Sequence, residues 1–412
     1  MSISIENLLD LPGVQVLKTE IHEREISIHV KIESNYTRCH KCGQKATEFH
    51  CDGETFRLRH LPIFERRVYL YLHTKRYRCL NCDDHPTTTQ HGDWYDLDAH
   101  CTKAYTDYLL RDLVGSTLAD VARKHEVAYG VLRGLLLRQV SDQVDWSQIT
   151  SLRVLGLDEI SLLKGHRDFV TIVSTRDAEG CPVILAVLEG REKETVKVCL
   201  QSIPAELRAT IADVCTDMYD GFANAVKEVL PQARVIADRF HVARAYRAAV
   251  DELRKVELRE LKASLKPEEY AGLKGVMWAL RRNQADLTDE AWQLLELLFE
   301  CSPALRQAYK LREKLTRIFE THHTKASARR AIRQWMAAVK RSGLDCFDKF
   351  LVTLENWMDE ITNYFINRLT SGWVEGFNNR IKVLKRRCYG LTSPASLFRR
   401  LWLDLNGLDA FA

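Results

Sequence analysis

The chain has 412 residues, of which 46% are hydrophobic and 28% are charged, and its formal net charge is +4. This composition is that of a soluble globular protein, and the length allows about two to four domains. Residues 1–18 show no signal-peptide pattern and no apolar run reaches the roughly 20 residues of a membrane span, so we expect a cytoplasmic protein.

Residues 1–100 are expected to form a β-rich module. From residue 14 to residue 32 apolar and polar side chains alternate, and Val68, Leu70 and Leu72 continue the same period of two further along the chain. This alternation is typical of half-buried strands. Closely spaced cysteines lie where turns between these strands are expected.

The module contains two Cys-x2-Cys motifs, which begin at Cys39 and at Cys79. In a reducing cytoplasm such pairs indicate metal or redox chemistry more often than disulfides, and redox motifs do not normally occur twice. Four thiolates bind one zinc ion tetrahedrally. The predicted Zn²⁺ ligands are Cys39, Cys42, Cys79 and Cys82. The residues that could replace one of these ligands are Cys51, His85 and Cys101.

Residues 101–150 change to a helical period and predict a helix-turn-helix. Helices are expected at 104–114, 117–125 and 129–140, and the last two are joined by a tight turn. Each basic residue here could belong to an ordinary solvated surface, but as a group they favour contact with DNA phosphates and bases. The predicted DNA-binding residues of this region are Arg123, Lys124, Tyr129, Arg133 and Arg138.

Residues 151–243 are predicted to form the first part of a mixed α/β core. Strands at 154–162, 169–175 and 183–188 are linked by short polar turns. Later strands are expected at 211–216 and 235–237, and helices at 194–203 and 219–230. Three hairpin-linked strands followed by strand–helix–strand crossovers indicate a mixed sheet with helices packed on it.

Residues 244–366 predict an all-helical insertion, because they are long, charged and amphipathic with little strand signal. Pro267 and Pro303 mark expected helix ends. Residues 367–412 are expected to return to the core with a helix that carries Glu375 near its start. Beyond Glu375 every charged side chain up to Leu403 is basic.

A single carboxylate beside a basic strip suits a metal-dependent site that acts on a phosphate polymer. Asp158, in the middle of the first core strand, and Asp217, at the end of the fourth, could join Glu375. Three such carboxylates can hold two magnesium ions roughly 3.5–4 Å apart. Each acid alone could instead be a helix cap, and Glu159 or Asp220 could be the relevant neighbour.

These segments together resemble the ISL-three family of bacterial insertion-sequence transposases. The resemblance rests on Leu157-Asp158-Glu159, Asp217-Met218, Ala237-Asp238-Arg239-Phe240-His241-Val242, Val374-Glu375-Gly376-Phe377-Asn378-Asn379-Arg380-Ile381-Lys382 and Lys385-Arg386-Arg387. The paired cysteines and the helix-turn-helix precede them in the order of the family, so nearly the whole chain is covered. The resemblance implies an RNase H-like core whose Asp-Asp-Glu triad falls on Asp158, Asp217 and Glu375.

The resemblance also implies the activity of a DNA transposase. Such a protein would bind the terminal inverted repeats of its element, cleave DNA with Mg²⁺ or Mn²⁺, and join the freed 3′-hydroxyl to target DNA. It would act as a homodimer or larger assembly in the bacterial nucleoid, because two element ends must be brought together. The alternatives are an inactive DNA-binding regulator derived from a transposase and a two-metal nuclease without strand transfer, and the three intact acids argue against the regulator.

Other positions of the family motif carry weaker expectations. Asp238 either caps the following helix or assists near the metals, together with His241. Ser371 stands where the family often has Asn, and both are good helix N-caps. For Arg399 and Arg400 we expect an ordinary solvated surface.

The helix that carries Glu375 is expected to contact DNA. Asn379, Lys382 and Arg386 follow Glu375 at intervals of four, three and four residues, so these four side chains share one face of a helix. Asn378 lies close enough to touch the same substrate. The predicted DNA-binding residues of this helix are Asn378, Asn379, Lys382, Lys385 and Arg386.

Overall fold

The computed structural model describes residues 8–161, 169–369, 372–388, 391 and 393–412, and for Gly372, Trp373 and Glu375 it describes the backbone alone. The chain divides into two compact units, one formed by Met1–Val140 with Leu403–Ala412 and the other by Ser141–Trp402. No helix among the described residues combines the length and the apolar character that a membrane span requires.

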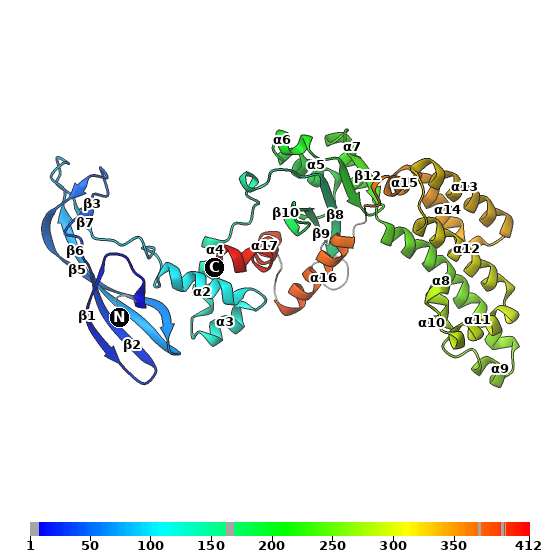
Figure 1. The fold of residues 1–412 in the computed structure, drawn as a ribbon, viewed down its shortest axis with the longest axis horizontal. Coiled ribbons are helices and arrows are strands. Elements are labelled where there is room, and N and C mark those ends of the chain that lie inside the picture. The colour runs from blue at the N-terminus through cyan, green and yellow to red at the C-terminus, as the bar shows by residue number, and fades with distance from the viewer. Residues whose placement is uncertain (1–7, 162–168, 370–371, 389–390, 392) are drawn as a thin grey trace. The chain divides into compact units, whose positions relative to one another are not determined.

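A five-stranded sheet forms most of the first unit (Figure 1). The strands are β1 (Val14–Ile21), β2 (Glu25–Ile32), β5 (Glu48–Ile63), β6 (Arg66–Arg78) and β7 (Thr87–Thr89). Their order is β1-β2-β6-β5, with β7 also paired to β6, and β2 runs parallel to β6. The core includes Val30, Val68, Leu70 and Leu72, which are all fully buried. The predicted alternation along the chain is therefore confirmed.

Three helices follow this sheet: α2 (Lys103–Leu113), α3 (Leu118–Lys124) and α4 (Tyr129–Gln139). Thr102 caps α2 and Thr117 caps α3, because each hydroxyl accepts a hydrogen bond from a backbone N–H of the first turn. All three helices begin and end within one residue of their predicted bounds. Leu113, Val121 and Leu132 are fully buried.

A second five-stranded sheet forms the centre of the second unit (Figure 1). Its strands are β8 (Val154–Ser161), β9 (Phe169–Arg176), β10 (Pro182–Glu189), β11 (Asp213–Thr216) and β12 (Arg234–Ala237). The order is β10-β9-β8-β11-β12; β8, β9 and β10 pair antiparallel, whereas β11 lies parallel to both β8 and β12. The predicted mixed sheet is confirmed, and its first and fourth strands are neighbours.

Helices connect these strands at nearly the predicted places. They are α5 (Lys193–Ser202), α6 (Ala205–Ala209) and α7 (Asp220–Val229), and a short 3-10 helix, Trp146–Gln148, precedes the sheet. Val196, Leu200, Phe222 and Val226 are fully buried in the same cluster as the strand residues. The five-residue helix α6 was not predicted.

Helices make up the described residues between β12 and residue 367 (Figure 1). They are α8 (Arg239–Ser264), α9 (Pro267–Ala271), α10 (Val276–Arg281), α11 (Asp289–Cys301), α12 (Pro303–Glu320), α13 (Lys325–Ser342), α14 (Asp348–Asn356) and α15 (Met358–Asn367), with 3-10 turns at Gln284–Asp286 and Asp345–Phe347. Pro267 and Pro303 each open a helix, as predicted. Helix α15 returns to the sheet, where the Asn363 side-chain amide donates to the Val235 carbonyl at 2.8 Å.

Two further helices close the second unit: α16 (Gly372–Arg387) and α17 (Pro394–Ala410), the last turns of which belong to the first unit. Helix α16 packs against β8 and β10 through Phe377, Ile381 and Leu384, which are nearly fully buried.

The solvated surface expected for Arg399 and Arg400 is wrong. Arg400 is only 2% exposed, and Arg399 forms an ion pair with Asp142 at 3.1 Å. The helical period explains this outcome, because Arg400 follows the buried Leu397 by three residues and precedes the buried Leu401.

Candidate active site

Three neighbouring parallel strands of the second sheet are in register at the level where β11 and β12 end, and β8 continues from there to Ser161. Leu157 of β8 pairs with Thr216 of β11, and Thr216 pairs with Ala237 of β12. The residue that follows each of these is an aspartate. The three aspartates are Asp158, Asp217 and Asp238. The carboxyl ends of parallel strands are where open α/β sheets bind ligands, and Asp217 and Asp238 follow two such ends, level with Asp158 of β8.

Asp158 is held by two donors from different elements. Its Oδ1 accepts from the backbone N–H of Glu159 at 2.7 Å, and its Oδ2 accepts from the side-chain amide of Asn378 on α16. Burial raises the pKa of Asp158, and the nearby charge of Asp238 acts in the same direction. The two hydrogen bonds thus hold the Asp158 carboxylate in place, whereas its surroundings raise the free energy of its ionised form.

The pKa of Asp217 is raised by the same two causes, burial and a neighbouring negative charge. Burial raises its pKa to about 6, and the negative charge of Asp158 adds to the shift. Its Oδ1 accepts a hydrogen bond from the Thr216 hydroxyl at 3.4 Å. Two adjacent carboxylates that resist ionisation are a functional-site signal, because a bound cation would relieve both.

Asp238 both caps a helix and lies near the other two acids. Its Oδ1 accepts from the backbone N–H of Phe240 at 2.8 Å, which caps α8, and its Oδ2 lies 2.9 Å from Nδ1 of His241. The hydrogen bond to Asp238 raises the pKa of His241, and the charges of Asp158 and Asp217 act in the same direction. His241 therefore faces all three acids.

The side chain of Glu375 lies outside the described residues, so the triad of Asp158, Asp217 and Glu375 stays a prediction. The backbone of Glu375 is in α16, three residues before Asn378. Asn378 is 7% exposed, and its Oδ1 has no hydrogen-bond partner among the described residues. A buried acceptor beside Asp158 fits a cation or its bound water.

The other residues of α16 divide between two faces. Lys385 is half-buried and its Nζ donates to the Ser161 carbonyl, so this side chain faces β8 as Asn378 does. Burial lowers the pKa of Lys385. Asn379, Lys382 and Arg386 are exposed, as expected for side chains that contact a ligand in solvent.

Of the two alternative neighbours, Glu159 lies close enough for its negative charge to raise the pKa of Asp217. Glu159 accepts from Nη1 of Arg191 at 3.0 Å, and Asp220 is an exposed residue in the first turn of α7. Arg191 was not foreseen; its guanidinium also lies over the rings of Phe169 and Tyr219, at 5.2 and 5.1 Å. No sequence pattern marks Arg191, because its partners come from distant segments.

The four predicted zinc ligands come together in the first unit. The short antiparallel strands β3 (Thr37–Arg38) and β4 (Lys45–Ala46) flank the first motif. The four Sγ atoms lie within 4.8 Å of one another, with 4.0 Å between Cys39 and Cys82, 3.5 Å between Cys42 and Cys79, and 3.8 Å between Cys79 and Cys82. Zn–S bonds of about 2.3 Å in a tetrahedron require sulfur separations of about 3.8 Å, so the cluster fits zinc.

The backbone around this cluster also suits a metal. Backbone N–H groups, first that of Cys42, lower the pKa of the Cys39 thiol to about 6, which favours the thiolate that zinc binds. The possible substitutes lie outside the cluster: Cys51 is in β5, His85 hydrogen-bonds the Cys79 carbonyl at 3.1 Å, and the Cys101 thiol lies 3.3 Å from the Thr106 hydroxyl.

The basic residues predicted to bind DNA in the first unit lie around α3 and α4. Arg123 forms an ion pair with Asp120 at 2.6 Å, and Lys124 with Asp112 at 3.6 Å. The other three residues are exposed on α4, and they are Tyr129, Arg133 and Arg138. The predicted surface is therefore accessible, while its contact with DNA stays a prediction.

The chain is similar over nearly its full length to curated transposases. It is 28% identical over 404 residues to the transposase for insertion sequence element IS1001 of Bordetella parapertussis, covering 96% of both chains. It is 26% identical over 392 residues to the transposase for insertion sequence element IS1557 of Mycobacterium tuberculosis, strain CDC 1551, covering 90% of this chain and 86% of the relative. The IS1557 transposase of strain H37Rv matches equally well.

Family comparisons cover both the cysteine cluster and the candidate active site. Residues 35–82 match the zinc-finger of transposases IS204, IS1001, IS1096 and IS1165. Residues 155–401, more than half of the chain, match the transposase family of the ISL-three DDE type. The chain therefore belongs to the ISL-three family of DDE transposases, with a zinc ribbon near its N-terminus.

Proposed function

We propose that the protein binds the terminal inverted repeats of its insertion sequence, cleaves their strands with a divalent metal, and transfers the freed 3′ end to target DNA. The observation that carries this proposal is that Asp158 and Asp217 lie at the same level of adjacent parallel strands, with α16 hydrogen-bonded to Asp158. The strand order β10-β9-β8-β11-β12 supports an RNase H-like core, formed by residues 151–243 and 367–412 and interrupted by the helices of 244–366.

Asp158, Asp217 and Glu375 would hold Mg²⁺ or Mn²⁺. Oxygen ligands suit both ions, and a bound cation would offset the burial and the neighbouring negative charge that raise the pKa values of Asp158 and Asp217. When bound, the metal supplies Lewis-acid stabilisation of charge on the phosphate and acidifies water and hydroxyl groups. Glu375 is assigned because it precedes Asn378 by three residues, and residues at this spacing are neighbours on a helix.

The remaining residues of the site would orient the carboxylates and the DNA. The Glu159 N–H and the Asn378 amide fix the two oxygens of Asp158. Asp238 holds His241 through Nδ1, so the other imidazole nitrogen is available to a phosphate oxygen or a proton. In-line attack first by water and then by the 3′-hydroxyl requires no covalent enzyme intermediate.

DNA recognition is assigned to three surfaces. Asn379, Lys382 and Arg386 of α16 are exposed and would contact phosphates beside the carboxylates. The zinc ribbon and the predicted helix-turn-helix, residues 1–100 and 101–150, would recognise the inverted repeat. The residues of the helix-turn-helix that are predicted to bind DNA are Arg123, Lys124, Tyr129, Arg133 and Arg138. A homodimer or larger assembly would pair the two ends of the element.

Cleavage of a labelled duplex that carries one inverted-repeat end, in Mg²⁺, tests the proposal. We expect the wild type to cut at the element boundary, and Asp158→Asn and Asp217→Asn each to reduce the rate by more than about 100-fold, since even indirect loss of metal support costs 10- to 100-fold. Asp220→Asn is the matched control, because Asp220 is exposed nearby and should leave the rate unchanged.

Three outcomes separate the alternatives. Cutting by Asp158→Asn at the wild-type rate contradicts the proposed metal site. Absence of cutting by the wild type, with specific binding retained, identifies a DNA-binding regulator. Cutting without covalent joining to a target plasmid identifies a nuclease.

A further inference from the structure

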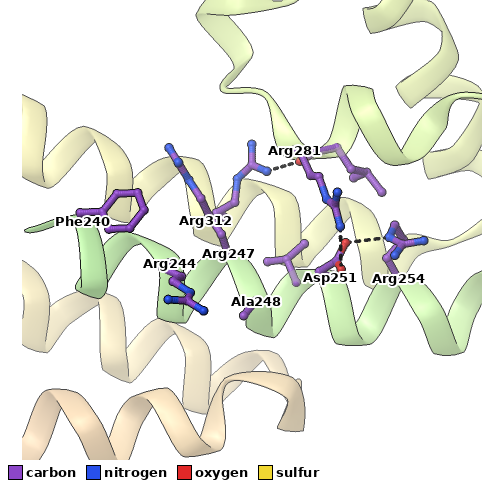
Figure 2. A pocket seen from close by; sticks show the side chains of 10 residues that line it. Phe240, Arg244, Arg247, Ala248, Asp251, Arg254, Arg281 and Arg312 are labelled. Carbon is purple, nitrogen blue, oxygen red and sulfur yellow. Dashed lines mark hydrogen bonds and ion pairs between the residues drawn. The ribbon is translucent and has the colours of Figure 1, made fainter. Parts of the chain in front are cut away.

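A basic pocket of about 410 Å³ lies along α8 in the helical part of the second unit (Figure 2). We call it the arginine pocket and define it by Phe240, Arg244, Arg247, Arg254, Arg281 and Arg312. Helix α8 supplies the first four of these side chains, and α10 and α12 supply Arg281 and Arg312. The pocket contains many more cations than anions, and such a concentration of positive charge attracts an anionic ligand.

Part of this positive charge is neutralised within the protein. Asp251 accepts from Arg254 at 2.9 Å and from Arg281 at 3.2 Å, as the dashed lines of Figure 2 show. Arg312 is buried, where it donates to the carbonyl oxygens of Leu280 and Arg282 and pairs with Glu313 at 2.7 Å. These three arginines therefore line the pocket, but their charges are already engaged within the protein.

Two arginines keep their charge available. Arg244 is exposed and makes no hydrogen bond or ion pair with any residue that the structure describes. Arg247 is also exposed, and its guanidinium makes one neutral hydrogen bond, to the side-chain oxygen of Asn283 at 3.2 Å. Exposed guanidinium groups without a carboxylate partner are suited to bind phosphate.

Helix α8 connects the candidate active site to the arginine pocket. Helix α8 begins after Asp238, and His241, Arg244 and Arg247 follow at intervals of three residues, which places them as neighbours along the helix. Arg247 lies six residues beyond His241, a rise of about 9 Å. One DNA strand advances about 3.4 Å per nucleotide, so this rise corresponds to two or three nucleotides.

The arginine pocket also contains an aromatic ring, next to His241 in the sequence. Phe240 is 47% exposed and lines the pocket, one residue before His241. An exposed ring beside arginines is the combination with which proteins bind nucleic-acid strands, because bases stack on the ring while cations hold the backbone.

We propose that the arginine pocket binds the backbone of the DNA strand that occupies the carboxylate site, two or three nucleotides from the reacting phosphate. Arg244 and Arg247 are the phosphate ligands, and Phe240 is the stacking surface for a base. The proposal rests on the proposed function, because it takes DNA as the substrate of the carboxylates. It adds a contact surface in the helical insertion, separate from α16 and from the first unit.

The test compares two double variants that each remove two positive charges from α8. Arg244→Ala with Arg247→Ala changes the pocket, whereas Arg259→Ala with Lys262→Ala changes exposed residues of the same helix outside it. The full-length protein is titrated without added Mg²⁺ against a fluorescein-labelled duplex that carries an inverted-repeat end and flanking DNA on both sides. Affinity is measured by anisotropy at several salt concentrations.

We expect the pocket variant to bind about 30-fold more weakly at 0.15 M salt and to lower the slope of log K against log salt by about 1.8, since each phosphate contact contributes about 0.9. The control variant should bind as the wild type does. Equal affinity and equal slope for the two double variants would overturn the proposal.

Cleavage by the wild type in Mg²⁺ is measured on the same duplex and separates this proposal from the proposed function. If the wild type cuts and the two double variants bind alike, the proposal that the arginine pocket binds DNA is refuted, and the proposed function is retained. If the wild type binds without cutting, the function fails, and the comparison of the double variants still decides whether the pocket binds DNA. Absence of binding by the wild type overturns both.

Discussion

Replacing Asp217 by asparagine should stabilise the metal-free protein at neutral pH. The pKa of Asp217 is raised from its ordinary value of 3.8 to about 6, chiefly by burial and then by the charge of Asp158. A difference of about 2 pKa units corresponds to about 3 kcal/mol, at about 1.36 kcal/mol per unit. Asparagine keeps the shape of the side chain and removes the charge that the site disfavours.

The sign of the pH dependence follows from this shift. Between about pH 4 and pH 6 the folded protein keeps the Asp217 proton that the unfolded chain has lost, so stability falls as the pH rises through this window. Above about pH 6 the folded protein carries the full free-energy cost of an ionised Asp217. Asp217→Asn should therefore match the wild type below about pH 4, and its advantage of about 3 kcal/mol should be complete at pH 7 and above.

Thermal and urea unfolding at pH 4, 5, 6, 7 and 8 measure this difference, with Asp220→Asn as the exposed control. For a unit of this size, about 3 kcal/mol corresponds to a rise in Tm of about 6–12 °C. Mg²⁺ should raise the Tm of the wild type and have a much smaller effect on Asp217→Asn, because binding to the folded state alone stabilises it. An Asp217→Asn protein that is less stable than the wild type at pH 7, or equally stable at every pH, would refute the reasoning.

Three other predictions concern the zinc cluster, the neighbour of Asp158 and the buried arginine. Cys42→Ser should lower the zinc content from one ion per chain to a small fraction and expose residues 35–82 to limited proteolysis. Cys301→Ser, which changes a half-buried cysteine outside both groups of potential metal ligands, should keep both properties. Asn378→Ala should reduce the cleavage rate by about 10- to 100-fold with little change in DNA affinity, since it leaves Asp158 Oδ2 without its donor; an unchanged rate contradicts this role. Arg400→Ala should lower the free energy of unfolding, measured by urea titration, by about 2–4 kcal/mol. Arg386→Ala, which changes an exposed residue, should lower it by less than about 0.5 kcal/mol. Similar losses for both variants would mean that burial of Arg400 does not stabilise the fold.

The strands could be predicted where a local pattern determines them. The period of two at Val68, Leu70 and Leu72 follows from a strand with one buried face, and all three side chains are fully buried. The parallel pairing of β2 with β6 could not be predicted in the same way. It joins Glu25–Lys31 to Arg67–His73, which are separated in the sequence by β3, β4 and β5, and the pattern within a strand does not identify the strand it pairs with.

Asp158 and Asp217 were proposed as active-site residues from the order of the elements and from the family resemblance. Asp158 and Asp217 follow from the first and fourth strands of a mixed sheet, and the structure makes these strands neighbours. The alignment of Asp238 with them was not foreseen, because β12 has only four residues and its register depends on β11. The sequence left Asp238 as either a cap or a neighbour of the site, and the geometry makes it both.

The errors and omissions share a physical cause. Arg399 and Arg400 were assigned to solvent by their charge, although the helical period places Arg400 beside buried leucines. The arginine pocket was missed because Arg244, Arg281 and Arg312 come from three helices that only the tertiary fold brings together. Distant side chains that meet across helices leave no spacing for a sequence pattern to reveal.

Joining of DNA ends tests the central claim most directly. A labelled inverted-repeat end with a free 3′-hydroxyl is incubated with supercoiled target plasmid in Mg²⁺, and covalent joint molecules are measured for the wild type, Glu375→Gln and the surface control Glu355→Gln. Our account predicts joining by the wild type and by Glu355→Gln, and a loss of more than about 100-fold for Glu375→Gln. Joining by Glu375→Gln at the wild-type rate would contradict the assignment of Glu375 as the third carboxylate of the active site.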